Sequence, residues 1–147
     1  MDRAASYLGD WKAGYEAGEV FITDRYTTSN AVYQTSKLDD EGAWDAFNDW
    51  LFDFEYNKLG IPAPDATIFL DVSAETSEAL MEKRYQGDEN KKDIHERDIE
   101  YQRRCRKAAC HCADRYGWKT VNCSAGGGLR SVEDIAEEVL RHALEVL

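Results

Sequence analysis

The side chains best suited to chemistry lie in one run, Asp24-Arg25-Tyr26-Thr27-Thr28-Ser29-Asn30-Ala31-Val32-Tyr33-Gln34, which follows the apolar residues 20–23. An arginine leaving the carboxyl end of a strand can present a rigid fork of donors to a phosphate dianion. Asp24 beside it can accept a hydrogen bond, orient that arginine or lie near a metal. Asn30 offers the donor and acceptor needed to read a pyrimidine edge, and Tyr33 can pack against a sugar. The run therefore predicts a site for a phosphate and a base.

A structural interpretation of the same run is a salt-bridged Arg25 followed by a helix that Ser29 caps. That interpretation suffices for an isolated Asp-Arg pair. A salt bridge and a helix cap do not explain the other residues of the run, so we favour the interpretation as a binding site.

The strands and helices expected along the sequence, which must position these residues, indicate an α/β fold. Short apolar runs typical of buried parallel strands occur at 19–23, 66–72 and 118–123. Helical spacing is expected at residues 2–17, 29–37, 41–58, 75–84, 94–116 and from Ser131 onward, with a flexible Gly-rich loop at 124–128. Strands alternating with helices indicate a parallel sheet flanked by helices, in a single domain over 1–147. Ser131 is expected to cap the last helix, whose predicted buried face includes Leu140 and Leu147.

Composition restricts the partners. Asp and Glu total 29 against 18 Lys and Arg, a net charge of −11, which disfavours binding to nucleic acid because such binding neutralises phosphates with basic residues. No apolar run approaches the roughly 20 residues of a membrane span, and a cytoplasmic protein is expected. Cys110-His111-Cys112 is a poor metal motif because i,i+2 neighbours on a helix diverge, so we expect no protein metal site and reduced cysteines.

The run resembles the thymidylate kinases, whose Asp-Arg-Tyr-x-x-Ser-Asn-x-x-Tyr pattern it matches without a gap. The resemblance implies a P-loop kinase-like three-layer α/β/α fold that transfers a phosphoryl group from ATP to dTMP, with Mg²⁺. It implies that Arg25 holds the dTMP phosphate and that Asp24 lies near the reacting phosphates. It places Ser29 and Asn30 in the dTMP site, with Asn30 contacting thymine, and Tyr33 crowding the sugar against ribonucleotides.

The resemblance continues along the chain. Arg3 matches an arginine that reaches the thymine ring, and the opening helix matches one that serves a homodimer. A lid is expected at about 84–96, with Arg84 the preferred residue to close over ATP and stabilise the transferred charge. The Gly-rich loop falls where the family accommodates the ATP base, which implies contacts from Ser124, Ala125 and Gly126.

Two family features are missing from these 147 residues. No Gly-x-x-x-x-Gly-Lys-Ser/Thr loop occurs in these 147 residues, and this loop supplies amides and a lysine to ATP phosphates. The family's first strand, expected between the strands matching 19–23 and 66–72, is missing as well. We therefore expect a truncated thymidylate kinase, inactive or weak as it stands, with its start codon assigned inside a longer reading frame. The alternatives are a deoxynucleoside kinase, whose acceptor has no phosphate, and a non-catalytic nucleotide-binding module.

Overall fold

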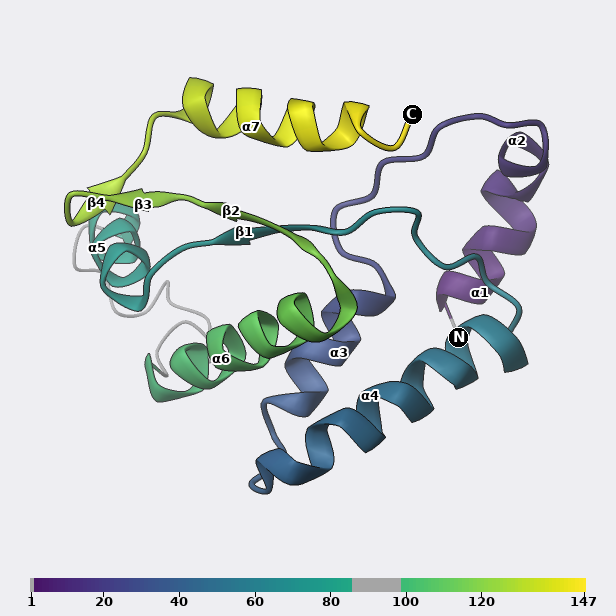
Figure 1. Ribbon diagram of the computed structural model, residues 1–147, viewed down its shortest axis with the longest axis horizontal. Helices are drawn as coiled ribbons and strands as arrows, with labels where there is room; N and C mark the ends of the chain where they lie inside the picture. Colours follow the sequence, from purple (N-terminus) through teal and green to yellow (C-terminus); the bar gives the residue numbers. More distant parts are fainter. Residues whose placement is uncertain (1, 86–98) are drawn as a thin grey trace. The chain divides into compact units, whose positions relative to one another are not determined.

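The computed structural model describes residues 2–85 and 99–147, with side chains for 3–80 and 99–147. The chain forms two compact units, Met1–Pro64 and Asp65–Leu147 (Figure 1). Each unit is treated separately below.

The first unit opens with one helical stretch in three parts. These are α1 (Asp2–Ser6), the π-helix η1 (Tyr7–Trp11) and α2 (Lys12–Glu16). The predicted helix at 2–17 is confirmed. Trp11 is central to the packing, because its ring lies 4.7 Å from that of Tyr7 and 5.9 Å from that of Tyr15.

The predicted strand at 19–23 is wrong, since the chain in this described segment forms no strand. A strand exists only through its ladder to a neighbour, and the side chains of Val20 and Ile22 are 60% and 88% exposed. The segment is held by aromatic packing instead. The Trp11 ring lies 5.2 Å from that of Phe21 and 6.3 Å from that of Tyr26. Asp24-Arg25 is therefore positioned by side chains on both flanks and does not end a strand.

The rest of the first unit is helical. It contains α3 (Thr27–Thr35), the 3₁₀ turn η2 (Glu41–Ala43), α4 (Trp44–Phe52) and the π-helix η3 (Asp53–Lys58). Predicted helices at 29–37 and 41–58 are confirmed, the first starting two residues early. Helix α3 packs on α4, where the buried Thr35 hydroxyl donates to Asn48 at 2.8 Å.

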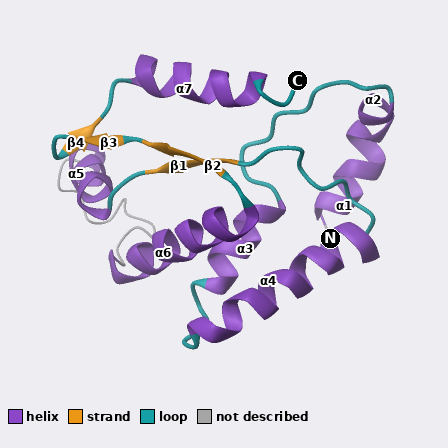
Figure 2. Cartoon of the chain, in the orientation of Figure 1, coloured by secondary structure: helices purple, strands orange, loops and turns teal. Residues whose placement is uncertain are grey.

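The second unit is the α/β part of the chain (Figure 2). It contains β1 (Ile68–Asp71), α5 (Ala74–Tyr85), α6 (Ile99–Tyr116), β2 (Lys119–Asn122), β3 (Ser124–Ala125), β4 (Gly128–Leu129) and α7 (Val132–Leu144). Strands β1 and β2 pair in parallel, with Ile68 opposite Lys119 and Asp71 opposite Asn122. Helix α6 packs on β1 and α7 on β2, from opposite sides of the strands (Figure 1). The predicted α/β class, a parallel sheet flanked by helices, is confirmed.

Small side chains let α6 approach the strands closely. Its fully buried positions include Ala108 and Cys112, and Val121 of β2 is also fully buried. The four cysteines, all in described segments, form no disulfide with one another. Burial raises the pKa of the Cys110 thiol. Among the described residues no group of His, Cys, Asp and Glu side chains could hold a metal ion, and no helix is long and apolar enough to span a membrane.

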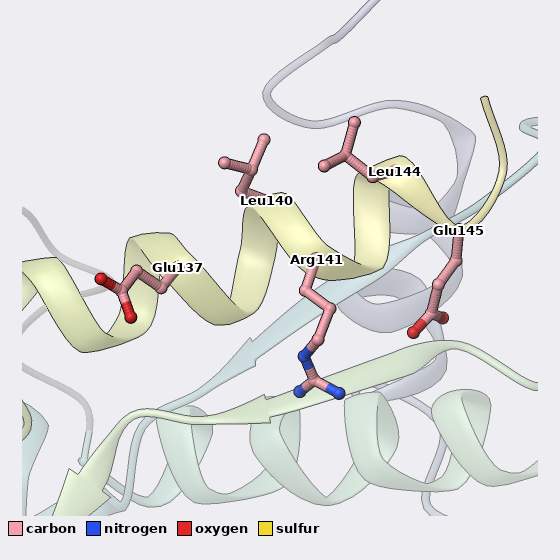
Figure 3. Close-up of a pocket in the computed structure, with 5 residues that line it drawn as sticks. All are labelled: Glu137, Leu140, Arg141, Leu144 and Glu145. Carbon is pink, nitrogen blue, oxygen red and sulfur yellow. The ribbon is translucent and has the colours of Figure 1, made fainter.

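Helix α7 begins as predicted, because the Ser131 hydroxyl accepts from the Asp134 amide at 3.1 Å. Its predicted buried face is wrong, because no residue of α7 is buried. Val132 is 71%, Leu140 57% and Leu147 73% exposed, whereas Ile135, Val139 and Ala143 are half-buried. A shallow hollow of about 360 Å³ on the outer side is lined by Leu140, Leu144 and three charged neighbours (Figure 3). It contains none of the predicted site residues.

Candidate functional site

Arg25 has an unusual backbone. Its φ is +64°, the left-handed region that a bulky side chain rarely adopts. Such outliers cost about 1–3 kcal/mol and concentrate at binding and catalytic sites. The exposed guanidinium lies over the ring of Tyr33, with its central carbon 5.5 Å from the ring centre. The arginine and the tyrosine predicted for the site are thus in contact.

Helix α3 gathers the other residues of the run. Ser29 and Asn30 stand four and three positions before Tyr33, so all three lie on one side of the helix. All three are partly exposed. Since α3 begins at Thr27, Ser29 lies inside it, and the interpretation of Ser29 as the helix cap is wrong.

The start of α3 has no side-chain cap from its N-cap residue. The N-cap residue is Tyr26, whose side chain does not cap the helix and instead donates its hydroxyl to the Pro62 carbonyl at 2.9 Å. The first amides of a helix carry partial positive charge and attract phosphates. Arg25 immediately precedes this end, so backbone and side chain together favour negative charge there.

Asp24 is exposed beside Arg25. A single carboxylate suits Mg²⁺, which keeps several waters and uses substrate phosphates as further ligands. The exposed carboxylate of Asp24 is accessible to a Mg²⁺ ion that arrives with a nucleotide.

Arg3 lies in a partly buried polar cluster. It forms an ion pair with Glu55 of η3, and around them lie Tyr26 and Tyr56. Burial, followed by the nearby Tyr56 and Glu55, raises the pKa of Tyr26 to about 12. Burial likewise raises the pKa of Tyr56, whose hydroxyl hydrogen-bonds to that of Thr27 at 2.5 Å. The cluster thus joins the first helix to the start of α3.

In the second unit, polar groups meet at the carboxyl ends of β1 and β2. The guanidinium of Arg106, on α6, donates two hydrogen bonds to the carboxylate of Asp71, at 2.6 and 2.7 Å. Ser124 accepts from the Ser73 amide at 3.0 Å, which ties the loop after β2 to the loop after β1. Strand carboxyl ends are the usual ligand edge of such sheets.

The predicted ATP loop is a β-hairpin rather than a flexible loop. Ser124 and Ala125 form β3, which pairs with β4, and the two central glycines have φ of +60° (Gly126) and +82° (Gly127). Positive φ at both central residues is the type I′ turn, which is easiest for glycine. The predicted residues are therefore held in a defined turn.

Two predictions fall on parts that are not described. The side chain of Arg84, in the last turn of α5, lies outside the described side chains, and most of the expected lid at 84–96 lies outside the described residues.

Sequence reasoning missed Glu55 and Arg106. Glu55 continues the buried stripe of Trp44, Asn48 and Leu51 along the helix, and a charge at an apolar position was the available signal. The pairing of Arg106 with Asp71 joins residues 35 positions apart and left no local signal.

Comparisons with known proteins identify the family to which the chain is similar. A sequence model of the family described as thymidylate kinase matches residues 1–135. The thymidylate kinase of Mycobacterium tuberculosis is 39% identical over 87 residues, covering 58% of this chain and 40% of that protein. That of Limosilactobacillus fermentum is 32% identical over 133 residues, covering 87% of this chain and 56% of that protein. The chain thus spans about half the length of these curated relatives.

Proposed function

The chain belongs to the thymidylate kinase family, and we propose that its first unit binds dTMP as the acceptor in ATP-dependent formation of dTDP. The observation that carries the proposal is Arg25, held at positive φ over Tyr33 and directly before the uncapped start of α3. A dianionic phosphate is the ligand that best uses a guanidinium and helix amides together.

The remaining roles follow from the chemistry of each side chain. Asn30 reads the thymine edge, Tyr33 crowds the sugar, and Ser29 lies beside them on α3. Arg3 contacts the thymine ring from the partly buried cluster. Asp24 lies near the reacting phosphates, where it would orient Arg25 or face the Mg²⁺ ion that arrives with ATP, and the ion would neutralise charge on the transferred group.

ATP is assigned to the second unit. Ser124, Ala125 and Gly126 border its base, supported by their fixed hairpin and by the bond from the Ser73 amide to Ser124. Arg84 is proposed to stabilise the transferred phosphoryl group. The proposal also includes a cytoplasmic homodimer with no nucleic-acid or membrane partner, and sedimentation of the purified chain tests the dimer.

Catalysis by these 147 residues is proposed to be weak. Phosphoryl transfer depends on positioning and electrostatics, and the sequence has no Gly-rich phosphate loop. The chain should therefore bind dTMP yet yield almost no dTDP with ATP and Mg²⁺. Turnover of about 1–100 per second, typical of kinases, would contradict this part of the proposal.

Calorimetry with dTMP and thymidine tests the phosphate clamp. Arg25→Ala should weaken dTMP binding more than tenfold, a loss above ~1.4 kcal/mol, and leave thymidine affinity unchanged because thymidine has no phosphate. Lys37→Ala, which removes an exposed cation just beyond α3, is the matched control and should change neither affinity. Unchanged dTMP affinity in Arg25→Ala would reject the clamp. Tighter binding of thymidine than of dTMP by the unmutated chain would favour a deoxynucleoside kinase.

A further inference from the structure

Thr27, the first residue of α3, is a polar residue that is fully buried. Its hydroxyl hydrogen-bonds to that of Tyr56 on η3, at 2.5 Å. The two residues are 29 positions apart in the sequence, so this bond joins the start of α3 to another helix. A buried hydroxyl that loses its partner costs about 1–3 kcal/mol, so each of the two hydroxyls depends on the other.

The ring of Tyr56 is held independently of Thr27. It stacks on the ring of Phe52, with the ring centres 5.5 Å apart and the planes within 8° of parallel. Phe52 is the last residue of α4, which continues directly into η3. Burial raises the pKa of Tyr56, so its hydroxyl stays protonated near neutral pH. The hydroxyl is therefore a fixed point to which the start of α3 is attached.

A second hydroxyl attaches the preceding residue to the same stretch of chain. Tyr26, the N-cap residue of α3, donates its hydroxyl to the Pro62 carbonyl at 2.9 Å. Two consecutive residues at the start of α3 are thus attached to the segment 56–62. Arg25 directly precedes them, so its backbone is joined to a fixed end of the helix.

The backbone of Arg25 requires such support. Its left-handed φ of +64° costs about 1–3 kcal/mol and persists only where the surrounding structure imposes it. The contact of its exposed guanidinium with the ring of Tyr33 contributes about 0.5–1 kcal/mol. This contact at best equals the smallest strain, so the attached residues that follow Arg25 must supply the rest.

We propose that Tyr56 is a positioning residue for phosphate binding, whose bond to Thr27 holds the start of α3 and so keeps Arg25 in the backbone conformation that presents its guanidinium to a phosphate. This inference rests on the proposed function, in which Arg25 binds the phosphate of dTMP. Tyr56 acts through Arg25 and does not contact the nucleotide. Loss of its hydroxyl should therefore weaken the part of the affinity that comes from the phosphate and leave the part that comes from the base and the sugar.

The competing role for Tyr56 is only to stabilise the fold, and α3 offers a matched control. Thr35, the last residue of α3, is also fully buried and donates its hydroxyl to Asn48 of α4 at 2.8 Å. Thr27→Val and Thr35→Val each remove one buried hydroxyl and should lower the free energy of unfolding by similar amounts. Only Thr27 lies at the end of the helix that follows Arg25, so only Thr27→Val should change phosphate binding.

The experiment measures by calorimetry the affinities for dTMP and for thymidine, which has no phosphate. Tyr56→Phe and Thr27→Val should each lower the dTMP:thymidine affinity ratio at least threefold. The double variant should lower it no further, because both changes remove the same bond. In an Arg25→Ala background, Tyr56→Phe should leave the ratio unchanged. Thr35→Val should keep the ratio of the unmutated chain.

An unchanged ratio in folded Tyr56→Phe, an equal fall in Thr35→Val, or the same fall with and without Arg25 overturns the inference and leaves Tyr56 a purely stabilising role. If the single variants do not fold, the double variant leaves neither hydroxyl unpaired. A lowered ratio in that variant supports the inference, and an unchanged one rejects it. If the unmutated chain binds dTMP no more tightly than thymidine, the proposed function itself fails. A full preference for dTMP in the variants rejects only the role of Tyr56.

Discussion

The two units position their polar residues by different means. In the second unit, Asp71 and Ser124 are placed by a parallel β-ladder and a hairpin, so the backbone fixes them. In the first unit, the described residues form no strand, and Arg25 is placed by aromatic rings and the helix start that flank it. Arg3 is likewise placed by an ion pair.

The difference predicts where each unit is vulnerable. A ladder of backbone hydrogen bonds survives most single side-chain changes, because the donors and acceptors remain. An arrangement built on Trp11 and on the pair of Arg3 with Glu55 depends on a few side chains. Single substitutions should therefore disturb the arrangement of polar residues more in the first unit than at the strand ends of the second unit.

The largest effect is expected at Trp11, whose ring contacts four other aromatic rings. Trp11→Ala should destabilise the first unit by about 2–3 kcal/mol, below the cost of a fully buried tryptophan because Trp11 is partly exposed. It should also release the segment that carries Arg25 and weaken dTMP binding. Amide hydrogen exchange measures the stability of each unit separately.

The matched control is Trp50→Ala, which removes an indole that is 58% exposed in the same unit and should cost less than about 1 kcal/mol. Amides of β1 and β2 should keep their protection in both variants. Equal loss of protection in the two units after Trp11→Ala would show that they unfold together and would break the comparison.

A smaller effect is expected at Asp71. Asp71→Asn removes the negative charge that pairs with Arg106 but leaves the hydrogen bonds between β1 and β2 intact. The side chain of Arg106 is 43% exposed, which weakens this ion pair. The free energy of unfolding of the second unit should fall by about 1 kcal/mol. Chemical denaturation measures it, with the exposed Asp65→Asn as control. A loss above about 3 kcal/mol would mean that side chains, not the ladder, hold these strand ends.

The smallest effect concerns pH and Tyr26. Unfolded tyrosine ionises with a pKa near 10, whereas that of Tyr26 is raised to about 12, chiefly by burial. Its contribution to stability is thus fully present below pH 10 and is lost as the pH rises towards 12. Tyr26→Phe should make the alkaline fall in stability shallower, slightly so, since solvent screens a partly exposed group. Absorbance titration should also lose its highest-pH tyrosinate step; retention of that step in Tyr26→Phe would reject the assignment.

The sequence predicted the elements that have local patterns, and it failed where the structure depends on contacts between distant segments. Local patterns correctly predicted the helices, the parallel strands at 68–71 and 119–122, the Ser131 cap and the residues of α3. They failed at 19–23, where an apolar β-branched run has the composition of a strand but pairs with no strand in the part of the chain that the structure describes. Strand formation depends on a neighbour, which composition does not report.

The candidate site divides in the same way. Spacing on one helix brought Ser29, Asn30 and Tyr33 together, and that was predictable. The positive φ of Arg25 and the pairing of Arg3 with Glu55 were not, because each depends on contacts between distant segments.

The account rests on Arg25 and α3 forming a dTMP site, and the most direct test is an NMR titration of the ¹⁵N-labelled chain. With dTMP, the amides of Arg25, Thr27 and Thr28 and the side-chain amide of Asn30 should shift saturably. With thymidine, the Asn30 signal should shift while the Arg25 amide stays in place. Absence of any shift in residues 24–33 at millimolar dTMP would contradict the account.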